Sequence, residues 1–139
     1  MFEIGISDEF EAAYALKGDF GPATRLHGHT YRVEVIAEAR EVDETGTFYD
    51  IGGLRTDLRA VLDEMHYHNL DDLPEMAGRN TTAEVVAQHI FKRMSMPLRD
   101  SRIVSLKVTV WESPSIFASY RETFERWGVK NGEESKLPA

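Results

Sequence analysis

Alternating apolar and polar residues indicate strands in both halves of the chain. In residues 29–40 the odd positions from Tyr31 to Ala37 are apolar, and the even positions are mostly charged. Side chains two residues apart in a strand share a face, so this segment predicts a strand with one buried face. Shorter extended pieces are predicted at residues 2–6 and 10–14. Two more strands are predicted at 103–111 and 115–120, with Pro114 at the turn between them.

Two segments in the middle of the chain repeat apolar residues at helical spacing. The first helix is expected to begin near residue 51, and the second at a capping box formed by Thr81–Glu84 and ended by Pro97. The apolar positions expected on the buried faces are Leu54, Leu58, Val61, Leu62 and Met65 in the first helix, and Val85, Val86, Ile90 and Met94 in the second.

The predicted order ββααββ is typical of an α+β fold. We expect a four-stranded antiparallel sheet with two helices on one face. Apolar residues remain on the other face, so we expect a second copy to cover it, in an oligomer that closes into a barrel. The domain is placed at residues 1–125, followed by a polar tail at 126–139.

Composition narrows the classes of function. The 139 residues suit one domain, and without cysteine the chain has no disulfide and no thiol nucleophile. A net charge of −8 argues against general nucleic-acid binding, which needs a basic face. No segment has the length of a membrane span or the pattern of a signal peptide, so we expect a cytoplasmic protein without membrane contact.

Two histidines separated by glycine begin the most regular predicted strand. His27 and His29 are two residues apart, so their imidazoles point to the same face. A catalytic zinc site commonly takes three protein ligands and keeps one position open, so this pair is a candidate for part of one. The alternative is that they are two polar residues at the edge of a sheet.

Six short motifs occur in order along residues 2–121. They are Phe10–Ala13, His27–Tyr31, Gly46–Ile51, Asn69–Asp72, Thr81–Glu84 and Val110–Ser113. In order and spacing they resemble the 6-pyruvoyltetrahydropterin synthase and 6-carboxytetrahydropterin synthase family. The resemblance implies a T-fold, trimers that pair into hexamers, and pterin pockets between subunits.

The resemblance also implies an activity. Family members convert 7,8-dihydroneopterin triphosphate into a tetrahydropterin with loss of triphosphate, and the 6-carboxy branch feeds queuosine synthesis. We therefore expect a zinc-dependent, pterin-binding lyase. The alternatives are a divergent homologue that binds pterin but cleaves the dihydroneopterin side chain or does no chemistry, and a purely structural oligomer.

The metal site implied by the family has two matching positions and one that differs. His27 and His29 match two of the three zinc ligands, and the third position is Tyr14. A phenol with an ordinary pKa of about 10 is a poor ligand at neutral pH unless the metal lowers that pKa. The alternative is that Tyr14 packs in the core with its hydroxyl on a hydrogen-bond partner.

The family's catalytic residues are replaced in this chain. Ala23 stands at the cysteine position, and His66 and Tyr67 stand where the family has an aspartate and a histidine. A modest backbone shift could bring His66 or His68 into the site as a base, because histidine titrates near neutrality. For His68 the alternative is a solvated loop residue.

The remaining candidates concern binding of the pterin. Glu112 matches the family glutamate that accepts hydrogen bonds from the 2-amino group and a ring N–H, and its alternative is a solvated carboxylate at a strand end. Thr81 and Thr82 begin a helix whose N–H groups could contact a pterin oxygen. Helix capping alone would also explain both threonines.

Overall fold

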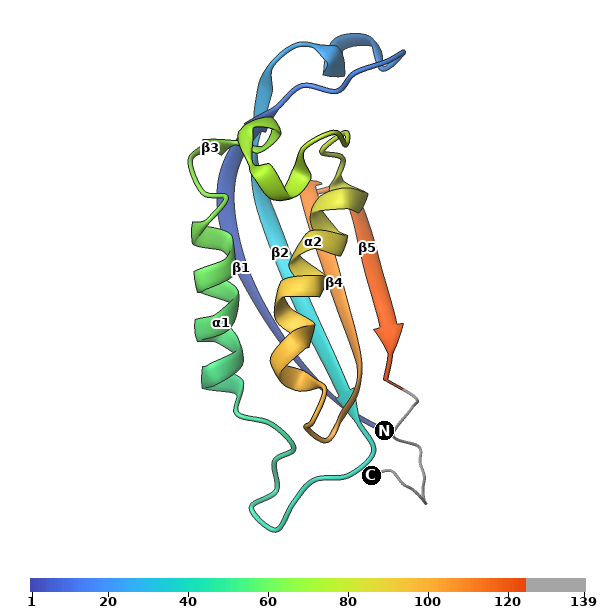
Figure 1. Ribbon diagram of the computed structural model, residues 1–139. Coiled ribbons are helices and arrows are strands. Elements are labelled where there is room, and N and C mark those ends of the chain that lie inside the picture. The colour runs from blue at the N-terminus through green and yellow to red at the C-terminus, as the bar shows by residue number, and fades with distance from the viewer. Residues whose placement is uncertain (125–139) are drawn as a thin grey trace.

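The computed structural model describes residues 1–124, so the predicted tail at 126–139 lies outside the described residues. The two α-helices of these residues lie on one side of a long, twisted sheet (Figure 1). Within residues 1–124, no helix combines the length and hydrophobicity of a membrane span. The elements, in chain order, are β1 (Phe2–Tyr14), β2 (His27–Ala39), α1 (Ile51–Asp63), β3 (His68–Asn69), α2 (Ala83–Ser95), β4 (Ile103–Ser113) and β5 (Ile116–Thr123).

In the described part of the chain the sheet has five strands in the order β3-β1-β2-β4-β5, which corrects the prediction of four. The additional strand, β3, pairs in parallel with Ala12 and Ala13 of β1. A two-residue strand is too short to produce a periodic pattern, so the sequence could not reveal it. The two extended pieces predicted near the N-terminus are one continuous strand of 13 residues. The α+β class and the two helices are confirmed.

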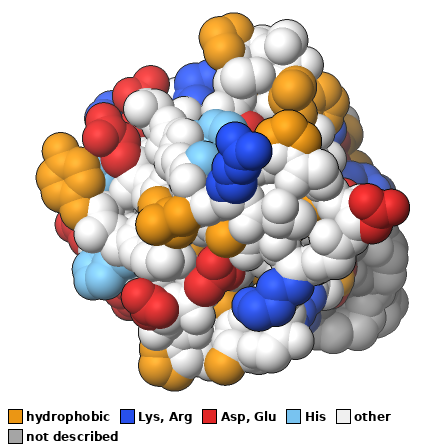
Figure 2. Space-filling view, turned by 90° about the horizontal axis from the view of Figure 1, so that it is seen from above, with side chains coloured by type: hydrophobic (Ala, Val, Ile, Leu, Met, Phe, Trp, Pro, Cys, Tyr) orange, Lys and Arg blue, Asp and Glu red, His pale blue; other side chains and the backbone are white. Residues whose placement is uncertain are grey.

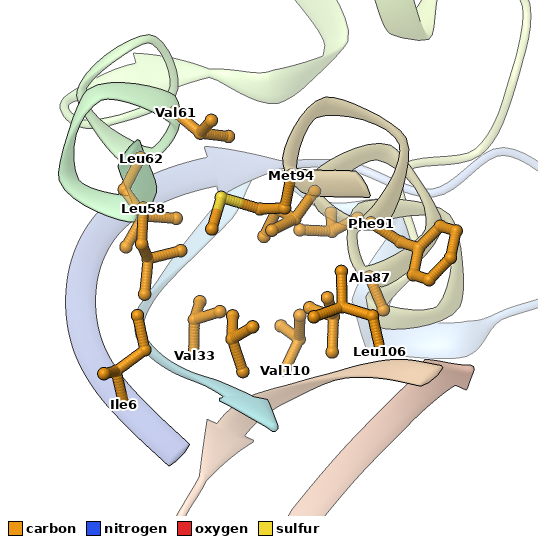
Figure 3. Close-up of a cluster of buried hydrophobic side chains, with 14 of the residues drawn as sticks. Ile6, Val33, Leu58, Val61, Leu62, Ala87, Phe91, Met94, Leu106 and Val110 are labelled. Carbon is orange, nitrogen blue, oxygen red and sulfur yellow. The ribbon is translucent and has the colours of Figure 1, made fainter. Parts of the chain in front are cut away.

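The core lies between the helices and the sheet (Figure 3). Leu54, Leu58 and Leu62 of α1 are buried, as the helical spacing predicted. On the sheet side, alternate residues of β2 such as Val33 and Val35 are fully buried. Burial of these apolar side chains is the main force holding α1 and α2 against the sheet.

The start of α2 differs by one residue from the predicted capping box. Thr82 is the N-cap, and its hydroxyl accepts a hydrogen bond from the N–H of Val85 at 3.3 Å. Thr81 lies before the cap and points to Asp71. The helix ends at Ser95, and Pro97 lies in the short 3₁₀ turn that follows.

Within residues 1–124, no helix covers the opposite face of the sheet. There the Arg32 guanidinium lies 5.1 Å above the ring of Trp111, which packs on Phe117 at 4.6 Å. Phe117, near the start of edge strand β5, is more than half exposed. This face therefore carries apolar side chains, as predicted, and its cover by a second copy remains a prediction.

Candidate functional site

Three rings converge at the end of the sheet where β1 ends and β2 begins. Tyr14 and His27 are paired across these strands, and the rings of Tyr14, His27 and His29 lie 4.4 to 5.6 Å apart. All three side chains are on the face that the helices cover, because His27 and His29 are two residues apart on β2. Figure 2 views this end from above and shows histidine side chains at the surface.

Glu112 joins these rings from a third strand. The hydroxyl of Tyr14 donates a hydrogen bond to Oε2 of Glu112 at 3.0 Å and lies 3.3 Å from Nε2 of His29. Glu112 lies at a register irregularity of β4 between Trp111 and Ser113, so its bond to Tyr14, and not the alternation of the strand, places its side chain in this cluster. The predicted metal pair and the predicted pterin anchor therefore belong to one cluster, which we call the His–Tyr–Glu cluster (Tyr14, His27, His29 and Glu112).

A hydrogen bond to the backbone orients the imidazole of His27. Its Nδ1 lies 2.7 Å from the carbonyl oxygen of Arg25, so Nδ1 carries the proton and donates it. Nε2 then has a lone pair available for a cation. Histidines that bind metals are commonly oriented in this way by a backbone carbonyl.

The phenol of Tyr14 stays protonated in this environment. Burial, followed by the negative charge of Glu112 and the hydrogen bond to it, raises the pKa of Tyr14 well above its ordinary value. Among residues 1–124 no three His, Cys, Asp or Glu side chains are grouped so that they could hold a metal ion. The structure thus brings the imidazoles of His27 and His29 together beside a neutral phenol, and the binding of a cation by this pair remains a prediction.

Tyr31 lies beneath the cluster on β2. Its ring stacks on Phe10 at 4.7 Å and contacts His29 edge-on at 5.5 Å, and the side chain is fully buried. Burial, then the neighbouring Tyr14 and Glu112, raises the pKa of the Tyr31 phenol. Its hydroxyl makes no hydrogen bond of normal geometry with residues 1–124.

Replacing Tyr31 with phenylalanine is expected to leave the free energy of unfolding unchanged or to raise it by about 1 kcal/mol. The change keeps the ring stack and removes a buried hydroxyl whose desolvation is not offset by a hydrogen bond. Urea unfolding followed by circular dichroism measures it. A loss of more than about 1 kcal/mol would show that the hydroxyl has a partner in solution.

Asp71 holds together two segments next to the site, a role that the sequence did not predict. One carboxylate oxygen accepts the hydroxyl of Thr81 and the other accepts the N–H of Ala15, both at 2.9 Å. Asp71 thus ties the end of β1 to the start of α2. Its place in the motif Asn69–Asp72 was the only signal in the sequence. With the hydroxyls of Thr81 and Thr82 both engaged in the protein, their pterin contacts remain predictions.

We expect Asp71→Asn to lower the free energy of unfolding by about 1.5 kcal/mol, because two hydrogen bonds to a charged acceptor become one bond to a neutral amide. Denaturant unfolding measures the loss. Asp72→Asn is the matched control, because Asp72 is the exposed neighbour and should tolerate the same change. Equal stability of the two variants would contradict a bracing role.

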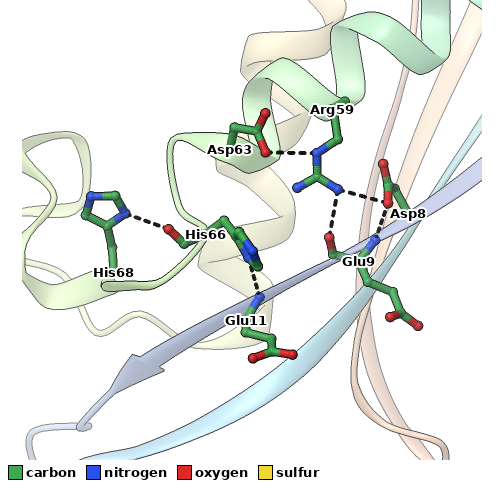
Figure 4. A network of polar contacts seen from close by, with 7 residues as sticks. All are labelled: Asp8, Glu9, Glu11, Arg59, Asp63, His66 and His68. Atoms are coloured by element: carbon green, nitrogen blue, oxygen red, sulfur yellow. Dashed lines mark hydrogen bonds and ion pairs between the residues drawn. The ribbon is translucent and has the colours of Figure 1, made fainter.

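His66 lies in the turn after α1, and His68 begins β3, which pairs with the outer edge of β1 (Figure 4). Nδ1 of His66 accepts the N–H of Glu11 at 3.1 Å, so its proton is on Nε2. Nδ1 of His68 lies 2.9 Å from the carbonyl oxygen of His66 and donates to it, which leaves Nε2 as an acceptor. In these tautomers His68, not His66, offers a nitrogen that can take up a proton.

Tyr67, between these histidines, has a strained backbone. Its φ of 59° is in the left-handed region that non-glycine residues rarely adopt. The conformation is held by its N–H bond to the carbonyl of Glu11 at 2.6 Å and by stacking of its ring on His66 at 4.0 Å. The exposed Tyr67 and His68 line an open cavity of about 520 Å³ that His29 also lines. Of the histidine pair only His29 is among the lining residues, and its neighbours Gly28 and Thr30, which also line the cavity, lie on the face of β2 opposite the His29 side chain.

Ala23, at the position of the family cysteine, lies in the 3₁₀ turn Gly21–Thr24 between β1 and β2. A methyl group there can neither donate nor accept a proton. The turn is fixed by backbone bonds, including Leu16 N–H to Ala23 O at 2.9 Å. Any base in this site must come from another segment.

Comparisons with known proteins agree on one family. The chain is 27% identical to 6-carboxy-5,6,7,8-tetrahydropterin synthase of Haemophilus influenzae, over 88% of this chain and 100% of that protein. It is 30% identical to 6-pyruvoyl tetrahydrobiopterin synthase of Dictyostelium discoideum, over 73% and 75%. The structure of Caenorhabditis elegans 6-pyruvoyl tetrahydropterin synthase superposes with a TM-score of 0.76 at 28% identity, covering 88% of this chain and 96% of that chain. Residues 3–123 match the family model described as 6-pyruvoyl tetrahydropterin synthase, and the chain belongs to that family.

Proposed function

We propose that this chain is a pterin-binding lyase of the 6-carboxytetrahydropterin synthase type that acts on 7,8-dihydroneopterin triphosphate. The observation that carries the proposal is the His–Tyr–Glu cluster, in which a carboxylate suited to a pterin ring lies beside two imidazoles. The names of the relatives support the same reaction class.

Glu112 is the proposed anchor of the pterin. An ionised carboxylate accepts two parallel hydrogen bonds, and a pterin offers a 2-amino group and a ring N–H side by side. The hydroxyl of Tyr14 already donates a hydrogen bond to Oε2 of Glu112. Each carboxylate oxygen has more than one lone-pair direction, so this bond is compatible with both pterin contacts.

Zn²⁺ is the proposed cofactor, and His27 and His29 would hold it. When bound there, zinc would polarise oxygens of the substrate side chain as a Lewis acid. The proposed acceptor of the proton removed from that side chain is Nε2 of His68, which lies beside the open cavity. His66, whose Nε2 carries a proton, would serve as a donor.

The partner in this proposal is a second copy of the chain. The helix-free face of the sheet and the exposed Ile116 and Phe117 are its proposed contacts in a trimer or hexamer. Sites between subunits would then complete the pterin pocket. Light scattering of the purified chain measures the oligomer directly, and a monomer at micromolar concentration would reject this part.

Incubation with 7,8-dihydroneopterin triphosphate tests the reaction. We expect release of inorganic triphosphate and a tetrahydropterin identified by mass spectrometry. His68→Gln, which keeps a polar side chain but cannot act as a base, should slow release by about 100-fold. Wild-type protein that binds the substrate and releases no triphosphate would reject the lyase.

A second candidate is favoured by the alanine at position 23. The family's proton-transferring cysteine is replaced by a methyl group, while the cluster with Glu112 remains. A homologue that binds pterin and cleaves the dihydroneopterin side chain, or does no chemistry, would retain these features. Product analysis with unphosphorylated dihydroneopterin distinguishes side-chain cleavage from binding alone.

A further inference from the structure

We infer that Tyr14 is a positioning residue for Glu112: its hydroxyl fixes the carboxylate in the orientation that receives a flat nitrogen heterocycle. This inference rests on the proposed pterin binding and assigns Tyr14 a role other than metal ligation. It starts from the bond between the Tyr14 hydroxyl and Oε2 of Glu112 at 3.0 Å.

Tyr14 is a rigid donor. Only 3% of its surface is exposed, and its backbone is the last paired position of β1, opposite His27. Its ring contacts both His27 and His29, which leaves little room for another rotamer. A phenol also carries its oxygen in the plane of the ring, so packing of the ring determines where the hydroxyl lies.

Glu112 needs such a donor. It lies near the end of β4, just before the turn to β5, and its side chain is only partly buried. Among residues 1–124, the Tyr14 hydroxyl is the donor that the structure assigns to this carboxylate. Without it the carboxylate would sample several rotamers, and a ligand would have to order it on binding.

The single proton of the hydroxyl is already committed. It is donated to Glu112, while the oxygen of the same hydroxyl lies 3.3 Å from Nε2 of His29. Tyr14 therefore couples the imidazole pair to the carboxylate by direct contacts. A histidine or phenylalanine at this position could not reproduce the same bond geometry, because neither carries a phenolic oxygen.

Fluorescence titration of the full-length protein with neopterin tests the inference. Tyr14→Phe keeps the ring and should weaken neopterin binding about 10-fold. Glu112→Asp keeps the charge but is one methylene shorter, so it should lose the Tyr14 bond by itself. In that background Tyr14→Phe should change affinity by less than about 2-fold.

Tyr120→Phe is the matched control. It also removes a tyrosine hydroxyl bonded to a glutamate, Glu122, on β5. Tyr120 pairs with Val108, four residues along β4 from Glu112, or about 13 Å at the rise of a strand. Its neopterin affinity should equal that of the wild type.

The outcomes separate this inference from the proposed function. Wild-type protein that binds no neopterin overturns the proposed pterin binding, and the inference falls with it. Wild-type binding with an unchanged Tyr14→Phe variant overturns the inference alone. An equal loss from Tyr14→Phe in the wild-type and Glu112→Asp backgrounds also overturns it, because general damage to packing would act in both.

Discussion

Replacing Glu112 with glutamine is expected to weaken pterin binding by about 100-fold. The substitution keeps the size of the side chain but turns one acceptor oxygen into an NH₂ group that faces the N–H donors of the pterin. One charge-assisted hydrogen bond is lost, and the new NH₂ group faces an N–H donor of the pterin. Together these changes cost about 2.7 kcal/mol of binding free energy. Titration with neopterin at neutral pH measures the affinity.

Glu122→Gln provides the control for this substitution. Glu122 is a carboxylate on β5 that accepts the Tyr120 hydroxyl, so it makes the same kind of bond away from the cluster. The control should bind neopterin as the wild type does, and both variants should retain the circular dichroism spectrum of the native fold. Equal affinities for Glu112→Gln and the control would place the pterin elsewhere.

Much of the fold follows from local patterns. The apolar alternation at Tyr31, Val33 and Val35 predicted the buried face of β2, and the leucine spacing predicted α1. The patterns failed where the deciding contact is distant in sequence. Thr81 and Thr82 are equally good caps by residue type, and the choice between them depends on Asp71, to which the hydroxyl of Thr81 is bonded.

The site was predictable in its parts but not in its connections. Spacing of two residues identified the histidine pair on one face of a strand. The bond between Tyr14 and Glu112 spans 98 positions and requires β1, β2 and β4 to lie side by side in register, which no periodicity reports. The distinction between His66 as donor and His68 as acceptor likewise comes from their backbone partners.

Replacing Tyr14 with histidine is expected to raise the affinity for Zn²⁺ by about 100-fold. The wild-type cluster offers two imidazoles and a phenol that burial and Glu112 keep neutral. A third imidazole at the same position, across from His27, would complete the three-nitrogen set that zinc commonly takes in catalytic sites. Competition with a zinc indicator at pH 7, in the absence of pterin, measures the affinity for Zn²⁺.

Tyr14→Phe is the matched control for this gain, because it removes the hydroxyl and adds no ligand. Its zinc affinity should lie within about 3-fold of the wild type, because a neutral phenol contributes little to binding. Adding His27→Ala to Tyr14→His should return the affinity to the wild-type level or below, since two imidazoles then remain. A Tyr14→His variant with native circular dichroism and unchanged zinc affinity would show that the imidazoles of His27 and His29 do not share a cation. Zinc would then have no place in the mechanism of this chain.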